Sequence, residues 1–169
     1  AGNAAVAATR TITLDNLAPQ VSIDATLEID NIVNSAEEGS VVVTGTSAGA
    51  VGRTVTVTAD DSNGGTTAVG ATGTIQTDGT YSVTLGTIDG LDDGSITITA
   101  DVSDLAGNAA TQATKTLTYD DAAPSITIAT TLEGDNKVNA AEDGHVVVSG
   151  SSSGLEAGRT VTAVSYTHL

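Results

Sequence analysis

The chain has 169 residues, of which 21 are acidic and 5 are basic, so its formal net charge at pH 7 is −16. That charge argues against binding to nucleic acid or to an anionic membrane surface, because both need clusters of Lys and Arg. The absence of Cys, Phe, Trp and Met excludes disulfide and thiol chemistry, and predicts a core built from small aliphatic side chains.

The first segment, residues 1–18, is predicted to be the C-terminal strand and linker of a preceding repeat. With Pro19 it reads "AGNAAVAATRTITLDNLAP", and residues 106–124 read "AGNAATQATKTLTYDDAAP". The match continues to residue 45, and 27 of these 45 residues are identical to those 105 positions later. A period of this length suits an independent domain rather than a solenoid unit. We therefore expect part of a longer chain of tandem domains.

Residues 19–120 are predicted to form one complete repeat. Val or Ile alternates with Thr or Ser in segments such as "RTVTVTAD" (53–60), which is the pattern of half-buried strands. Turn residues such as Asp78-Gly79 separate these segments. Seven strands are expected, at residues 20–26, 40–46, 53–60, 66–77, 80–85, 95–102 and 111–119.

This strand pattern predicts the fold class. Seven short antiparallel strands in about 100 residues are typical of an immunoglobulin-like sandwich, here without the Cys and Trp of antibody domains. An up-and-down barrel is the alternative. The expected class is all-β, with tandem immunoglobulin-like antiparallel β-sandwiches of about seven strands per repeat.

The last part of the chain is predicted to begin a further repeat. Residues 121–163 match the start of the complete one, and Arg159 pairs with Arg53 after a one-residue insertion. Residues 164–169, "VSYTHL", resemble the translated adapter of transposon-based sequencing libraries. We interpret them as a sequencing scar rather than as a divergent strand.

The closing sequences of the complete repeat are similar to those of a known family. "DGTYSV" (78–83), "LDDGSITITADVSDLAGNAA" (91–110) and "DDAAP" (120–124) resemble the bacterial Ig-like (BIg) repeats of giant surface adhesins, such as those exported by type I secretion. The resemblance covers the chain except its last six residues. It implies a non-enzymatic stalk module of an extracellular, cell-surface or biofilm protein, whose linkers in several members bind calcium.

Acidic residues gather in the loops at the two ends of the expected sandwich. Because strand direction alternates, the linker at 15–16 shares one end with the loop that contains Asp104. The loop that contains Asp30, the loop at 92–93 and the linker at 120–121 share the other end. Crowded carboxylates repel one another unless a cation bridges them.

Calcium suits these positions, because it takes six to eight oxygen ligands in loose geometry. With no Cys and only His145 and His168, a site for a softer metal is disfavoured. The hypothesis is that each junction between repeats binds Ca²⁺, and the alternative is that these residues only form turns and keep the protein soluble. The candidate ligands are Asp15, Asn16, Asp30, Asp92, Asp93, Asp104, Asp120 and Asp121.

Two further loop residue types are expected to have structural roles. Asn3 and Asn108, in the two "AGN" sequences, are predicted to cap a turn through side-chain hydrogen bonds. Glu37 and Glu142 precede a strand, and are predicted to structure their loops rather than to act as general bases.

The expected function is mechanical, with no enzymatic activity. The repeats would form a calcium-stiffened extender in cell adhesion or biofilm formation, with neighbouring repeats as partners and an unknown host or matrix ligand at a distal tip. Catalysis is disfavoured because the sequence shows neither an aromatic platform nor a cleft-forming insertion. Two alternatives remain: a module that itself binds a glycan or a protein, and a wall or S-layer repeat without an adhesive role.

Overall fold

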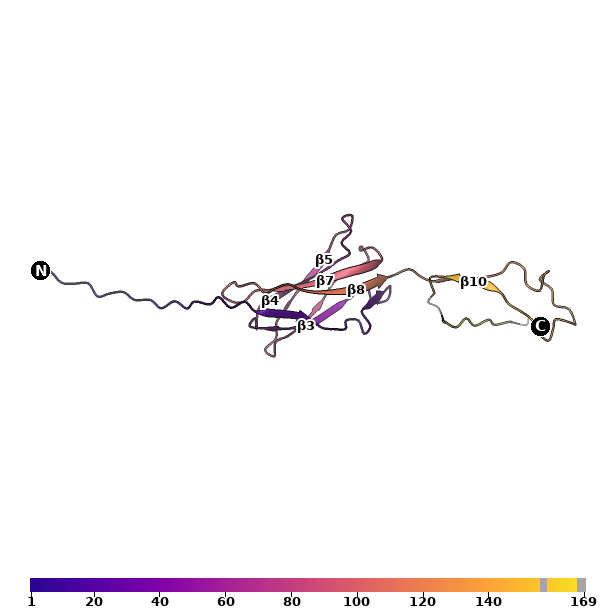
Figure 1. The fold of residues 1–169 in the computed structure, drawn as a ribbon, viewed down its shortest axis with the longest axis horizontal. Helices are drawn as coiled ribbons and strands as arrows, with labels where there is room; N and C mark the ends of the chain where they lie inside the picture. Colours follow the sequence, from indigo (N-terminus) through magenta and orange to yellow (C-terminus); the bar gives the residue numbers. More distant parts are fainter. Residues whose placement is uncertain (156–157, 167–169) are drawn as a thin grey trace. The chain divides into compact units, whose positions relative to one another are not determined.

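The structure, a computed structural model, describes residues 1–155 and 158–166 (Figure 1). The chain divides into two compact units, Ala1–Asp121 and Ala122–Leu169. All regular structure in the described residues is β-strand, and no helix there is long and apolar enough to cross a membrane.

Two sheets form the first unit, whose residues are all described. The smaller sheet has the order β1-β3-β6, and the larger has the order β2-β8-β7-β4-β5. The strands of the smaller sheet are β1 (Gln20–Ile23), β3 (Val42–Ala48) and β6 (Thr80–Thr84). Those of the larger sheet are β2 (Ile32–Asn34), β4 (Thr54–Asp60), β5 (Val69–Thr74), β7 (Gly94–Val102) and β8 (Ala113–Asp120).

The alternating sequence pattern places one face of each sheet in a shared core. In β4, Val55 and Val57 are fully buried, whereas Thr54 and Thr56 are exposed. Residues of both sheets contribute to a single hydrophobic cluster, which packs the sheets face to face. The predicted all-β sandwich is therefore confirmed.

One strand of the sandwich was not predicted, and its pairing differs from the expected one. β2 pairs with β8 in parallel, with Ile32 opposite Thr118 and Asn34 opposite Asp120. Its three residues bury only the Val33 side chain, which is too little for a period-two pattern to be recognised. The first unit therefore has eight strands rather than seven, and one of the pairs is parallel.

A glycine in β3 leaves room for the Tyr81 side chain of β6 to cross this strand and reach β1. The Tyr81 hydroxyl of β6 donates a hydrogen bond to the Ser22 carbonyl of β1 at 2.8 Å. This bond passes over Gly45, where a Cβ atom would lie 2.0 Å from the Ser22 oxygen and 2.5 Å from the Tyr81 hydroxyl. Any side chain at this position would force the strands to move.

Residues 1–18 have no strand in this structure. Ile12 and Leu14 are 86% and 88% exposed, although they correspond to Leu117 and Tyr119 of the complete repeat, which are buried. The strand expected in this segment would pair with strands of a preceding repeat. The assignment of this segment to a preceding repeat stays a prediction.

The described part of the second unit rebuilds the beginning of the complete repeat. β9 (Ser125–Ile128) pairs with β10 (Gly150–Ser153), and Ile128 lies opposite Gly150 just as Ile23 lies opposite Gly45. Of the predicted scar at 164–169, residues 164–166 have no regular structure and 167–169, including His168, lie outside the described residues.

Candidate metal centres

Strand register determines which loops share an end of the sandwich. Val102 pairs with Val55 at the end where β1 begins, and Gly94 pairs with Tyr119 at the end where β8 finishes. We call these the entry end and the exit end, because the chain enters the repeat at the first and leaves it at the second. The linker at 15–16 and Asp104 belong to the entry end. The loop at 92–93 and the linker at 120–121 belong to the exit end, as the strand order predicts.

At the entry end, Asp104 is held in the loop between β7 and β8. Its side chain is only 6% exposed, and both carboxylate oxygens accept hydrogen bonds from Asn108, one from the backbone N–H and one from the side-chain amide, each at 2.8 Å. The Asn108 side chain is the main cause of a lowered pKa of Asp104. The Asn108 side chain forms a hydrogen bond within this loop as expected, but the side chain that caps a backbone N–H of the turn is that of Asp104.

The same asparagine connects this loop with the linker. Asn108 also donates from its side-chain amide to the backbone carbonyl of Asp15 at 3.3 Å. The Asp15 carboxylate accepts a hydrogen bond from the N–H of Leu17 at 3.1 Å, while Asn16 is exposed. The structure therefore brings Asp15 and Asp104 together through Asn108, which was expected only to cap a turn.

At the exit end, acidic residues are linked in pairs, in which the backbone N–H of one donates to the carboxylate of the other. The N–H of Asp92 donates to Oδ2 of Asp61 at 2.7 Å, and the Asn63 amide donates to the Asp92 carboxylate. The bond from Asp92 is the main cause of a lowered pKa of Asp61, and the Thr66 hydroxyl adds to it. Asp61 was not among the candidate ligands, although its place in the turn after β4 put it at this end.

A second pair joins the exit linker to the loop before β7. The N–H of Asp121 donates to Oδ1 of Asp93 at 3.0 Å. Close by, the buried Tyr119 hydroxyl donates to Oε2 of Glu38 at 2.5 Å and to Oδ2 of Asp121 at 3.4 Å. Burial, followed by the bond to Glu38, raises the pKa of Tyr119 above that of a free tyrosine.

Two candidates remain, Asp30 and Asp120. Oδ1 of Asp30 accepts the N–H of Ile32 at 2.9 Å, which closes a local turn before β2. Asp120 is the last residue of β8 and lies opposite Asn34. The expected role of Glu37 is confirmed, because its carboxylate accepts both the backbone N–H and the side-chain amide of Asn34.

The donor chemistry of these residues fits calcium better than it fits other metals. Carboxylate and carbonyl oxygens lie at both ends, and they are the ligands that Ca²⁺ prefers. However, no group of three or more Asp, Glu, His or Cys side chains converges among residues 1–155 and 158–166. The carboxylates described here supply partial ligand sets, and the choice of ligands stays a prediction.

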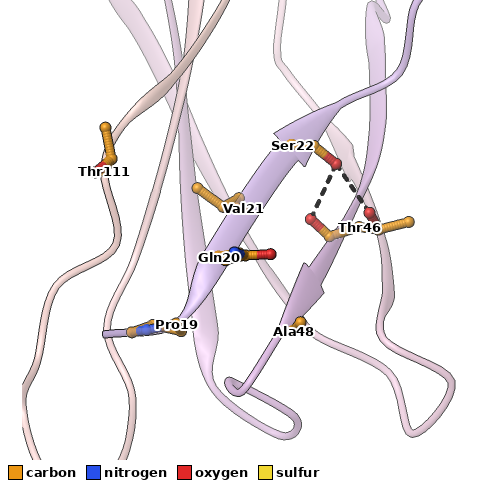
Figure 2. A pocket seen from close by; sticks show the side chains of 7 residues that line it. All are labelled: Pro19, Gln20, Val21, Ser22, Thr46, Ala48 and Thr111. Atoms are coloured by element: carbon orange, nitrogen blue, oxygen red, sulfur yellow. Dashed lines mark hydrogen bonds between the residues drawn. The ribbon is translucent and has the colours of Figure 1, made fainter. Parts of the chain in front are cut away.

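A hollow of about 390 Å³ lies beside the edge strand β1 (Figure 2). Pro19, Val21 and Thr111 line one part of it, and the hydroxyls of Ser22 and Thr46 are 2.8 Å apart in another part. Neither a titratable nor an aromatic side chain is among the described residues that line it. The hollow thus offers neither acid and base groups for catalysis nor a stacking surface for a sugar.

The structure is similar to solved structures of adhesion proteins. A tetra-tandem repeat in the extending region of a large adhesion protein aligns with a TM-score of 0.51 and 28% identity, over 82% of this chain and 32% of that one. A Ca²⁺-stabilized adhesin that helps an Antarctic bacterium reach out and bind ice aligns with a TM-score of 0.47 and 29% identity, over 83% and 34%. The chain thus spans about a third of the length of these two structures.

A single domain gives a third comparison. A bacterial immunoglobulin-like domain from the M. primoryensis ice-binding adhesin aligns with a TM-score of 0.38 and 26% identity, over 60% of this chain and 96% of that one. No family model and no curated protein matches the chain. Likeness to structural repeats agrees with the expected non-enzymatic module. The chain is similar in fold to the extending-region repeats of a large adhesion protein, as its resemblance to bacterial Ig-like repeats of giant adhesins implies.

Proposed function

We propose that the chain is a piece of the extender region of a large bacterial adhesin, in which successive immunoglobulin-like repeats hold an adhesive tip away from the cell surface. The observation that carries this proposal is that β9 and β10 restart the repeat in the register of β1 and β3, directly after a short linker. The likeness to an extending-region repeat supports it. Adhesion or biofilm formation, and export by type I secretion, belong to the same proposal.

The path of the chain through the repeat suits an extender. Residue 19 enters at one end of the sandwich, and Asp120 leaves at the opposite end, where Asn34 and Gly94 also lie. Repeats joined in this way add their lengths, whereas repeats whose termini share one end would fold back on each other. The ligand at the tip would be bound by another part of the adhesin.

Calcium at the junctions is the second part of the proposal. Asp15, Asn16 and Asp104 would supply oxygens at the entry end, together with residues of the preceding repeat. At the exit end the ligands would come from the loops and the linker, namely Asp30, Asp92, Asp93, Asp120 and Asp121. The bound ion would offset repulsion within a strongly acidic chain and restrict the movement of adjacent repeats.

The experiment that tests the calcium proposal is thermal unfolding of two complete repeats, made by joining two copies of residues 19–123, in EDTA and in millimolar Ca²⁺. A ligand that binds only the folded state raises the unfolding temperature. We expect a rise in calcium that is lost when Asp120 and Asp121 of the internal linker are changed to Asn. Asp89→Asn is the matched control, because Asp89 is an exposed acid outside the candidate set. Equal temperatures with and without calcium would contradict the proposal.

A further inference from the structure

The linker before the complete repeat makes direct contacts with that repeat. We propose that residues 15–19 are docked on the entry end of the repeat that follows them, and that Asn108 is the residue that holds them there. The loop between β7 and β8 therefore binds the linker that leaves the preceding repeat. This inference does not depend on calcium binding at the junction.

The C-terminal end of the linker is fixed by packing. Pro19 is buried, and it lies against Gly49 in the turn after β3, where a Cβ atom would be 3.4 Å from Cα of Pro19. Gly49 has a φ of +88°, a conformation that favours glycine. The carbonyl of the next residue, Gln20, accepts a hydrogen bond from the Ser47 hydroxyl at 2.6 Å. Figure 2 shows Pro19 and Gln20 at the start of β1.

The N-terminal end of the linker is fixed by Asn108, whose side chain is itself held in place. The nearly buried Asp104 carboxylate accepts one amide hydrogen of Asn108 at 2.8 Å, and the bond is strengthened by the charge. This bond leaves a second amide hydrogen for the Asp15 carbonyl at 3.3 Å. The direction of that carbonyl is set in turn by the bond from Leu17 to the Asp15 carboxylate.

The residues that make both contacts recur with the repeat. Pro124 lies against Gly154 as Pro19 lies against Gly49: a Cβ atom at Gly154 would be 3.3 Å from Cα of Pro124. Asp120 stands where Asp15 stands in the preceding linker, and Asn3 corresponds to Asn108. We therefore expect the linker to dock in the same way at each junction between repeats. Each junction should then remain partly stiff when calcium is removed.

Backbone ¹⁵N relaxation of the whole chain in EDTA tests the inference. In the unmodified chain we expect order parameters of about 0.8 for residues 15–17, close to those of the strands, and below about 0.6 for residues 1–10. Asn108→Ala removes the amide donor, and it should lower the values at 15–17 to those of residues 1–10. The control is Asn63→Ala, which removes a side-chain bond at the exit end and should leave the linker unchanged.

The unmodified chain decides the matter even if Asn108→Ala disturbs its own loop. Residues 15–17 that are as mobile as residues 1–10 in EDTA would overturn the docking. A linker that stays ordered in Asn108→Ala would overturn the role of Asn108. Repeating the measurement in calcium separates this inference from the proposed function, since metal binding can fail while the linker remains docked.

Discussion

At the scale of single residues, the stability of the repeat depends on a few side chains that form long-range hydrogen bonds in a core without Phe, Trp or Met. The chain has only three tyrosines, and two of them are buried with their hydroxyls bonded to distant segments. Tyr81 connects β6 to β1, and Tyr119 connects β8 to the loop that contains Glu38. In a core of small aliphatic side chains these long-range bonds hold loops and strands that have little apolar area to bury.

Among the strand glycines of the first unit, Gly45 is predicted to be the one whose substitution costs the most stability. In Gly45→Ala the new methyl would overlap the Ser22 carbonyl and the Tyr81 hydroxyl, so β1 and β6 would have to separate. We expect the free energy of unfolding, measured by urea denaturation, to fall by about 2–4 kcal/mol. Gly70→Ala in β5 is the matched control, because the nearest atom to its new methyl is 3.7 Å away. Equal losses for the two variants would contradict this account.

Acid stability is predicted to depend on Asp104. Its pKa is lowered in the folded state, so the unfolded chain takes up a proton before the folded chain does. The stabilisation is complete above the ordinary aspartate pKa of 3.8, and it is lost as the pH falls through the lower folded value. We expect the urea midpoint to drop below about pH 4, and to drop less steeply in Asp104→Asn. Identical slopes in both proteins would show that Asp104 does not contribute.

At the scale of elements, the pairing of β2 with β8 has a mechanical consequence. Tension on the entry linker acts first on β1, and once β1 has detached from β3 it pulls β2 towards the entry end, whereas tension on the exit linker pulls β8 towards the exit end. Because the two strands are parallel, these forces act along the strands in opposite directions. The hydrogen bonds of the pair are therefore loaded together in shear rather than opened one after another.

Single-molecule stretching of tandem repeats tests this consequence. Val33→Pro places in β2 a residue that cannot donate to the ladder, and we expect it to lower the unfolding force of each repeat. Val33→Ala is the matched control, because it reduces packing of the same buried side chain and keeps the backbone N–H. If both variants unfold at the same force, the β2–β8 pair does not bear the load.

The strands could be predicted from the sequence because their signal is local. Val and Ile alternate with Thr in β4 and β7, and the strand order then placed Asp104 and the 92–93 loop at opposite ends. β2 escaped prediction because a three-residue strand is held by a partner more than 80 residues away. The contacts of the loops depend on left-handed residues such as Ser62, which follows Asp61 and has a φ of 61°. No alternating pattern encodes such conformations, so the pairing of Asp61 with Asp92 could not be foreseen.

At the scale of the whole molecule, the second unit indicates how much of the repeat is determined locally. The loop between β9 and β10 reproduces the bonds of its counterpart: the Asn136 side chain accepts the N–H of Leu132 at 2.8 Å, as Asn31 accepts that of Leu27 at 3.0 Å. These bonds form although β9 and β10 are the only strands among the described residues of this unit. The first strands and loop of each repeat can therefore form from local sequence alone, which suits a protein built from many copies of one module.

We expect successive repeats to form an extended rod whose joints are stiffened by calcium. Small-angle X-ray scattering of the two joined copies of residues 19–123 tests it most directly. We expect a maximum dimension close to twice the length of one repeat in calcium, and a broader distribution of shorter distances in EDTA. A compact particle, with the two repeats folded against each other in both solutions, would contradict it.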